Sequence, residues 1–485
     1  MSLLEHFRSS SRMAPVPTAP VAVPPPSTNE SVAAIAAGPA AQDASPRGRS
    51  IVRNEALVEL KARVHEELIH ELDPDQLQGD LSYTSPARRA VEQAAEERLA
   101  LADSTLGRQE RLRLASEIAD EVLGLGPLEP LLRDATVTEV MVNGWDRVYF
   151  ERGGIIYRAD TSFRDDSHIL NIIDKILRPV SRRLDDSSPM VDARLPDGSR
   201  VNAVIPPLAV RGPSLTIRKF SRDLLAADDL VRLGTLGRST LDFLSACVRS
   251  RANVLVSGGT GTGKTTLLNL LSAFIPRAER IVTIEDPAEL QVKQDDWVSL
   301  ETRPPNIEGK GQIVQRDLVK NALRMRPDRI IVGECRGGEA FDMLQAMNTG
   351  HDGSLTTIHA NSPRDALSRI ENMVLMAVEL PISAIREQIA SGINVIVHIS
   401  RLQDGSRRVT HVTEIVGVQG GVVSMHDIFE FQGRGVDAQG QIVGQLQPTG
   451  LRPHVLDRLS QYGEHVPIEW FLPLVGSATD GVRAS

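Results

Sequence analysis

The chain has 485 residues, enough for two or three domains, with a net charge of −9 and only 4% aromatic side chains. This composition argues against a large nucleic-acid-binding surface, which needs basic stripes and stacking rings. The only cysteines, Cys247 and Cys335, exclude a disulfide framework and a four-cysteine zinc module, and they are typical of a reducing cytosol. No run approaches the roughly 18 apolar residues that span a bilayer, so we expect a soluble protein without a transmembrane segment.

The first part of the chain predicts a tail followed by helices. Residues 1–50 are rich in proline, alanine and serine and cannot bury enough apolar surface to fold, so we expect a disordered tail. Residues 51–123 predict a small helical module, because apolar residues recur there at three- and four-residue spacing. Those of the first helix are Leu57, Leu60, Val64, Leu68 and Leu72. A Gly-Leu-Gly-Pro break follows.

Residues 124–230 predict an α+β domain, because the apolar period becomes that of strands around one helical segment at 169–177. Two turn signals separate pairs of strands. Asn143-Gly144 predicts a hairpin with a type I′ turn, and Pro196-Asp197-Gly198 predicts a second hairpin. A further short strand is expected at 215–220.

Residues 231–435 predict a mainly parallel sheet covered by helices on both faces, since apolar strands alternate there with helical segments. The expected strands are 254–257, 281–284, 330–333, 355–358 and 393–399. Such sheets bind ligands at the carboxyl ends of their strands. A hairpin around Gly420-Gly421 follows, and residues 436–485 are expected to form a C-terminal extension with a short helix near 455–462.

The sequence of residues 258–265 matches the phosphate-binding (Walker A) pattern G-x-x-x-x-G-K-[ST] between an expected strand and an expected helix. Its glycines let backbone N–H groups converge on a phosphate, and the helix N-terminus adds positive potential. We expect Lys264 to reach the β- and γ-phosphates of ATP and Thr265 to ligate Mg²⁺. The predicted nucleotide-binding residues are Gly258, Gly259, Thr260, Gly261, Thr262, Gly263, Lys264, Thr265 and Thr266.

Two strands of the expected sheet end in acidic residues. Glu285 opens an acidic segment, Glu285–Glu289, that could hold Mg²⁺ or orient water, or could be a solvated turn. Glu334 follows Gly333 at the end of a second strand, where a carboxylate can polarise the attacking water. Thr265 and Glu334 are therefore the candidate Mg²⁺ ligands.

Histidines and arginines supply further candidates. His351 and His359 flank one expected strand, and they are either phosphate sensors or structural residues; a zinc pair is not expected, because no further ligands cluster nearby. Phosphoryl transfer often uses an arginine from another domain or subunit. The candidates for that role are Arg194, Arg200 and Arg218, for which an ordinary surface position is the simpler alternative.

Four blocks in this order, namely the phosphate-binding loop, the acidic segment, the Gly333-Glu334 strand end and the histidine pair, resemble the secretion ATPase superfamily of type II and type IV secretion and type IV pilus machines. The stretches 138–144, 192–202 and 324–329 further resemble the CpaF-type ATPases of Tad (Flp) pilus systems. The resemblance covers roughly residues 55–430.

The resemblance implies an α/β fold, with a RecA-like P-loop ATPase domain preceded by an α+β (PAS-like) domain and a small helical module. It implies a cytoplasmic homo-hexamer, docked at the inner membrane on a pilus platform protein, that uses ATP and Mg²⁺ to drive pilus assembly. Whether it also drives retraction is left open. A chain with two cysteines cannot carry the zinc module of many type II secretion and pilus-extension ATPases, which fits the Tad type.

The resemblance also assigns roles to single residues. Glu334 becomes the main catalytic carboxylate, and Glu285 belongs to the acidic box. His351 and His359 sense the γ-phosphate, while Arg194 and Arg218 reach the nucleotide from the α+β domain. Arg200 is the weaker arginine candidate.

Two other functions remain open. A DNA translocase is kept in view by conjugative members of the superfamily, although the acidic, aromatic-poor composition leads us to expect no direct binding of nucleic acid. A nucleotide-gated scaffold that scarcely hydrolyses ATP is opposed by the intact Lys264, Thr265 and Glu334.

Overall fold

The computed structural model describes residues 46–71, 85–180, 182–220, 225–306 and 309–473, with the backbone alone at 46–56, 58 and 71. The tail predicted over 1–50 thus lies outside the described residues, except that 46–50 are helical. The chain divides into two compact units, one of residues 1–78 and 89–118 and the other of residues 79–88 and 119–485. No described helix combines the length and the apolar character that crossing a membrane requires.

The first unit is built from helices, as the three- and four-residue spacing predicts. They are α1 (Pro46–Glu71), α2 (Pro86–Ala102) and the greater part of α3 (Arg108–Leu123). Leu60, Val64 and Leu68 lie along one buried stripe of α1, while Leu72 is outside the described residues. Buried apolar residues of α2 and α3 recur at the same spacing, so each helix turns one stripe inward.

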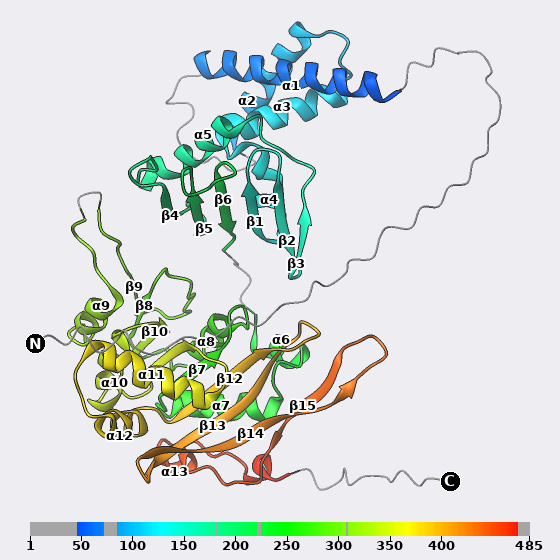
Figure 1. The fold of residues 1–485 in the computed structure, drawn as a ribbon. Helices are drawn as coiled ribbons and strands as arrows, with labels where there is room; N and C mark the ends of the chain where they lie inside the picture. Colours follow the sequence, from blue (N-terminus) through cyan, green and yellow to red (C-terminus); the bar gives the residue numbers. More distant parts are fainter. Residues whose placement is uncertain (1–45, 72–84, 181, 221–224, 307–308, 474–485) are drawn as a thin grey trace, which may run out of the picture. The chain divides into compact units, whose positions relative to one another are not determined.

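In the second unit, a six-stranded antiparallel sheet has the order β3-β2-β1-β6-β5-β4 (Figure 1). Its strands are β1 (Val137–Asn143), β2 (Val148–Arg152), β3 (Ile155–Arg158), β4 (Met190–Arg194), β5 (Arg200–Val204) and β6 (Ser214–Arg218). The short helices η2 (Gly126–Leu128) and α4 (Glu129–Arg133) precede it, and η3 (Arg178–Val180) follows the longer helix α5 (Asp166–Leu177). Isoleucines at one face of α5 pack against the sheet, and Asp165 caps the helix by accepting the N–H of His168.

Both hairpins predicted in this part are present, but one turn differs. Gly198, at a φ of 94°, closes the β4–β5 turn by donating its N–H to Leu195. The type I′ turn predicted at Asn143-Gly144 is wrong. Asn143 belongs to β1 and donates its N–H to the carbonyl of Arg147 at 2.9 Å, so the loop has three residues and only Gly144 takes a positive φ.

The larger sheet has nine strands in the order β15-β14-β13-β12-β7-β11-β10-β8-β9. The six from β12 to β9 are parallel, and the alternation of strands with helices predicted this. The strands are β7 (Val254–Gly258), β8 (Ile281–Glu285), β9 (Trp297–Glu301), β10 (Arg329–Cys335), β11 (Leu355–His359), β12 (Val395–Arg401), β13 (Arg407–Gln419), β14 (Val422–Val436) and β15 (Ile442–Pro448). Sequence patterns missed β9 and β15.

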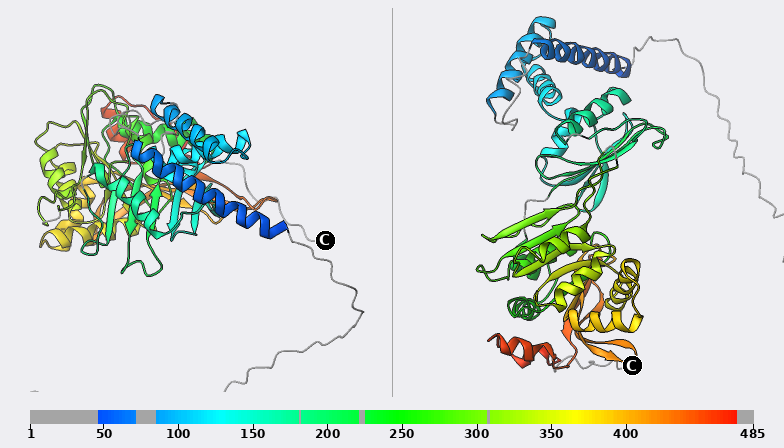
Figure 2. Two further views of the ribbon diagram at one scale, coloured as in Figure 1. Left: turned by 90° about the horizontal axis from the view of Figure 1, so that it is seen from above. Right: turned by 90° about the vertical axis from the view of Figure 1, so that its left-hand side faces the viewer.

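Two apolar cores cover the two faces of this sheet, as the period of two along β7 shows. Val254 and Val256 face one core, and Leu255 faces the other. The first core includes helices α6 (Ala227–Arg232), α7 (Arg238–Arg249), α8 (Lys264–Ser272) and α13 (Val455–Gln461). The second includes α9 (Gln315–Ala322), α10 (Glu339–Asn348), α11 (Pro363–Ala377) and α12 (Ile382–Gly392), of which α10 to α12 lie together in yellow in Figures 1 and 2.

The segment expected as a C-terminal extension contributes to the first core. The division placed at residue 435 falls inside β14, which pairs with β15. Phe471, in the short helix η4 (Ile468–Phe471), has its ring centroid 5.3 Å from that of Phe243 and 5.7 Å from that of Phe429. Residues 474–485 lie outside the described part.

Candidate functional site

The phosphate-binding loop joins β7 to α8 at the carboxyl edge of the parallel strands. Gly261 and Gly263 have φ values of 70° and 98°, which favour glycine. A Cβ on Gly258 would lie 2.3 Å from the carbonyl oxygen of Ile399, so glycine is needed where β12 passes. No side chain caps α8 at Gly263. The N-terminus of α8 therefore presents its N–H groups toward the loop, as an anion-binding turn does.

Lys264 is held over this loop. Its Nζ donates to the carbonyl of Gly259 at 2.9 Å and lies 3.8 Å from Oε1 of Glu334. Burial lowers the pKa of Lys264, and the neighbouring carboxylate of Glu334 opposes that shift. The ammonium is thus placed between the backbone of the loop and the end of β10, where the phosphates of a nucleotide would bind.

Glu334 lies on β10 beside the loop. Its Oε2 pairs with Arg336, at 2.8 Å from Nε and 2.7 Å from a terminal nitrogen. The preceding residue must be small, because a Cβ on Gly333 would lie 2.9 Å from Cγ of Glu285 on β8. The sequence Gly333-Glu334 is therefore explained by packing: Glu285 fills the space that a side chain at 333 would need.

Glu285 is not a solvated acid. It is 2% exposed, and its Oε1 accepts the N–H groups of Glu289 and Leu290 at 2.8 and 2.9 Å. Its Oε2 is buried without a hydrogen-bond partner among the described residues. Burial raises the pKa of Glu285 to about 7, although the two N–H groups act in the opposite direction. The solvated-turn alternative is therefore wrong for this residue, which anchors the acidic segment.

The two histidines lie at opposite ends of β11. His359 is in register with Gly258, and its Nδ1 lies 3.4 Å from the hydroxyl of Thr260 in the loop. His351 precedes the strand, and five strand residues span about 17 Å. The expectation that both histidines sense one γ-phosphate thus fails within one chain, where only His359 is at the loop.

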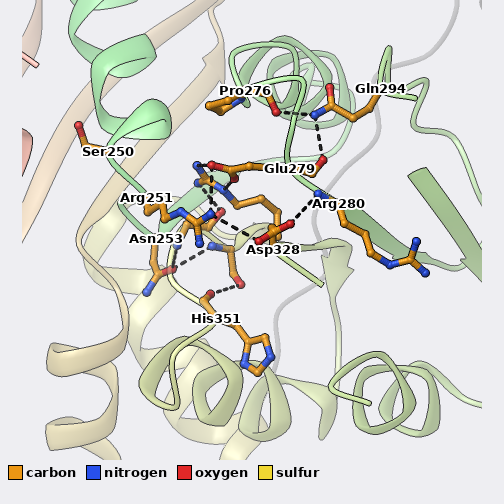
Figure 3. Close-up of polar contacts among 12 residues, drawn as sticks. Ser250, Arg251, Asn253, Pro276, Glu279, Arg280, Gln294, Asp328 and His351 are labelled. Carbon is orange, nitrogen blue, oxygen red and sulfur yellow. Dashed lines mark hydrogen bonds and ion pairs between the residues drawn. The ribbon is translucent and has the colours of Figure 1, made fainter. Parts of the chain in front are cut away.

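His351 belongs instead to the amino end of the sheet. Figure 3 shows it beside a polar cluster, in which Arg251 pairs with Glu279 and with Asp328. The carbonyl of His351 accepts the hydroxyl of Ser354 at 2.8 Å, and its buried Nδ1 has no hydrogen-bond partner among the described residues. These contacts point to a structural role of its backbone.

The three candidate arginines form a row across neighbouring strands. Arg194 is in register with Arg200, and Arg200 with Arg218. Arg200 pairs with Glu289 at 2.9 Å. Arg194 donates to the carbonyl of Ala288 at 2.9 Å and pairs with Glu301 at 3.0 Å.

A cavity of about 760 Å³ brings most of these groups together. Arg200 and Arg218 line it, whereas Arg194 does not. Arg200 is therefore better placed than Arg194 to reach a nucleotide, which reverses the order of these two arginines that the resemblance implied. The charged and polar residues of the wall outside the loop include Arg200, Arg218, Glu289, Glu334, Arg336, Thr357, His359 and Arg407. Of the predicted loop residues, 260–266 line the cavity. Glu285 and His351 do not.

Sequence reasoning missed two arginines of this wall. Arg336 lies two residues after Glu334 and could have been found as the polar residue that follows the strand. Arg407 donates from Nε to the carbonyl of Gly261 at 3.1 Å. It opens β13, which runs antiparallel to β12 and so starts at the edge where the parallel strands end. No local pattern marks that position.

The donor set fits Mg²⁺, which prefers oxygen ligands. The hydroxyl-bearing Thr265 and the carboxylate of Glu334 share the cavity wall. Glu285, whose Oε2 is buried without a hydrogen-bond partner among the described residues, stands on the strand next to that of Glu334. Thr265 and Glu334 are therefore the residues suited to hold the ion or its water ligands.

Comparisons with known proteins identify the family to which the chain belongs. The Type II/IV secretion system protein family matches residues 121–438, and the Type II secretion system protein E, N-terminal domain, matches residues 57–123. A putative conjugal transfer protein of Mycobacterium tuberculosis is 37% identical over 326 residues, which cover 65% of this chain and 92% of that protein. The type IV secretion system protein PtlH of Bordetella pertussis is 35% identical over 315 residues, which cover 59% and 93%.

Among solved structures, the VirB11 ATPase of the Brucella suis type IV secretion system is 31% identical to this chain. The match covers 59% of this chain and 92% of that one, with a TM-score of 0.33. The family match rests on the sequence, since the first family model spans well over half of the chain. The chain therefore belongs to the type II/IV secretion ATPase superfamily, as its four motifs indicated.

Proposed function

We propose that this protein is an ATP-hydrolysing motor that works as a homo-hexamer and powers the assembly of a Tad-type type IV pilus through an inner-membrane platform protein. The observation that carries the ATPase part is the shared cavity, where Glu334, His359 and four arginines line the wall around the phosphate-binding loop and its Lys264. Superfamily membership supports the motor part.

The residues divide the work of phosphoryl transfer. The N–H groups of the loop and Lys264 bind the phosphates of ATP. Thr265 and Glu334 would hold Mg²⁺, which would neutralise the charge that develops on the phosphates. Glu334 orients and polarises the attacking water, and its ion pair with Arg336 holds the carboxylate in place beside the loop. His359, beside Thr260, lies where it can sense the γ-phosphate.

Arg200 links hydrolysis to movement. It lines the cavity and is paired with Glu289 of the acidic segment, which Glu285 anchors. A bound triphosphate competes with Glu289 for this guanidinium, because phosphate oxygens are strong bidentate partners of arginine. Loss of the γ-phosphate would return Arg200 to Glu289, so each cycle would change the contacts between the α+β segment and the ATPase segment.

The Tad-type assignment rests on sequence blocks whose structure is now visible. Two of them, 138–144 and 192–202, are the hairpin segments of the smaller sheet, and the third ends at Arg329, which is buried and paired with Glu279. Both cysteines are buried in the two apolar cores, so neither is placed for a metal module.

The names of relatives favour a second candidate, a DNA-transfer ATPase, since one is a putative conjugal transfer protein. Steady-state ATP hydrolysis with and without single-stranded DNA separates the pilus motor from the DNA-transfer ATPase. Native mass spectrometry of the assembly tests the hexamer. The proposal predicts hexamers and a rate that DNA leaves within about twofold. Stimulation by DNA of tenfold or more would favour the translocase, and a chain that stays monomeric with nucleotide would contradict the hexamer.

A further inference from the structure

Three side chains outside the nucleotide cavity converge where the C-terminal segment meets the large sheet. Glu414 on β13 is in register with His426 on β14, and His454 stands at the N-terminus of α13. One potential ligand atom from each residue lies within 4.8 Å of the other two. Nothing in the nucleotide chemistry uses these residues, which belong to different elements of the first core.

The carboxylate of Glu414 is only half satisfied. Its Oε2 accepts the N–H of His454 at 2.7 Å and that of Val455 at 3.3 Å, so this oxygen holds the start of α13. Its Oε1 is buried and has no hydrogen-bond partner among the described residues. Glu414 is 2% exposed, and a buried carboxylate oxygen without a partner costs free energy unless a cation satisfies it.

The two imidazoles flank that oxygen. Nδ1 of His426 lies 3.9 Å from Oε1 of Glu414, too far for a hydrogen bond, and the rings of His426 and His454 have centroids 6.1 Å apart. Ligands of a tetrahedral Zn²⁺ site lie about 3.4 Å from one another, given bonds of about 2.1 Å. Because His426 is half-buried and His454 is exposed, small rotations of their side chains close the remaining distance around an ion.

We propose that Glu414, His426 and His454 bind a divalent transition-metal ion, with Zn²⁺ as the best match. A set of two imidazoles and one carboxylate suits Zn²⁺ and its first-row neighbours, whereas Mg²⁺ and Ca²⁺ prefer oxygen ligands throughout. Three protein ligands leave a fourth position for water. The ion joins the β13–β14 hairpin to α13 and so fastens the C-terminal segment to the sheet.

Binding of Zn²⁺ to the full chain, freed of any histidine tag, tests this proposal. Isothermal titration and elemental analysis after dialysis should give one ion per chain, and Co²⁺ in its place should give the visible absorption of a four-coordinate site. The double variant His426→Ala/His454→Ala should lose this binding at least a hundredfold. His465→Ala removes an exposed histidine that follows α13 in the chain and is not one of the three ligands, and it should bind as the wild type does.

A second readout separates a built site from weak surface binding. Stoichiometric Zn²⁺ should raise the thermal unfolding midpoint of the wild type and of His465→Ala, and it should leave that of the double variant unchanged. The proposal is overturned if the wild type binds no Zn²⁺, or if the double variant retains the wild-type affinity. The proposal is also overturned if Zn²⁺ raises the unfolding midpoint of the double variant as it does that of the wild type.

Discussion

The Nζ of Lys264 lies 3.8 Å from Oε1 of Glu334, which joins the first residue of α8 to the strand β10 across the intervening β11. A nucleotide phosphate bound on the loop would lie between a cation that attracts it and a carboxylate that faces its attacking water. Burial lowers the pKa of Lys264, and the carboxylate of Glu334 opposes that shift, so the buried ammonium is not left unpaired. Each of the two residues can be tested separately.

Lys264→Ala should remove the charge that binds the β- and γ-phosphates. We expect kcat/KM for ATP to fall by about 10²–10³, because one preorganised donor at a developing charge is worth that much. Lys320→Ala, in the exposed part of α9, is the matched control and should remain close to wild type. Equal activity of Lys264→Ala and the control would show that nucleotide is bound elsewhere.

The row of arginines predicts a contrast between two variants. Arg200→Ala removes a guanidinium from the cavity wall, and we expect kcat to fall at least about tenfold, as for arginines that stabilise phosphoryl transfer. Arg194→Ala removes contacts with Ala288 and Glu301 and, in the part of the chain that the structure describes, nothing from the cavity wall, so its kcat should stay within about threefold of wild type. Steady-state kinetics of the two variants provide the measurement. A larger loss of kcat in Arg194→Ala than in Arg200→Ala would contradict this prediction and favour Arg194 as the arginine that reaches the nucleotide.

The raised pKa of Glu285 predicts a pH dependence of stability. The folded chain holds this proton up to a pKa of about 7, whereas the unfolded chain releases it near 4.5, so stability falls as pH rises between these values. Glu285→Gln keeps an oxygen for the N–H groups of Glu289 and Leu290 but cannot ionise. We expect the unfolding free energy of Glu285→Gln, relative to that of the wild type, to increase by about 3 kcal/mol from pH 4.5 to 7. Above pH 7 this difference should stay constant.

Denaturant titrations of both proteins across this range provide the measurement. Glu379→Gln, which removes an exposed carboxylate, serves as the control. A difference between Glu285→Gln and wild type that stays constant with pH would mean that Glu285 is ionised in the folded chain throughout.

The aromatic cluster of the first core predicts that the C-terminal segment is needed for stability. Phe471→Ala should destabilise the chain by about 3–5 kcal/mol, since the ring is 1% exposed and packs against Phe243 and Phe429. Leu472→Ala, at the 53% exposed neighbour, should cost less than about 1 kcal/mol. Thermal unfolding is the measurement, and equal unfolding midpoints of Phe471→Ala and Leu472→Ala would contradict this packing.

Sequence patterns predicted the parts of the fold that repeat a simple period. The parallel strands β7, β8, β10, β11 and β12 and the hairpin of β4 and β5 follow from apolar runs bounded by turn residues. The strand β15 was missed because it is an edge strand rich in glycine and glutamine, and its pairing with β14 supplies what its propensity lacks. Asn143 was misread because its hydrogen bond to Arg147 outweighs the local turn preference.

The candidate site was predictable where one motif carries both position and chemistry. Lys264, Glu334 and His359 follow directly from strand ends that share one edge of the sheet. His351 and Arg194 could not be judged in this way, because their roles depend on which end of a strand or which cross-strand partner faces the nucleotide. Arg407 reaches the loop only through the antiparallel return of β13, which no local spacing encodes.

The central claim is that this cavity hydrolyses ATP through Glu334. The most direct measurement is the steady-state ATPase rate of the purified wild type and of Glu334→Gln, with nucleotide binding measured on the same samples. We predict that Glu334→Gln binds ATP as tightly as wild type and turns it over at least about a hundredfold more slowly, because it retains the phosphate contacts but lacks the base. Equal turnover by the two proteins would contradict the account.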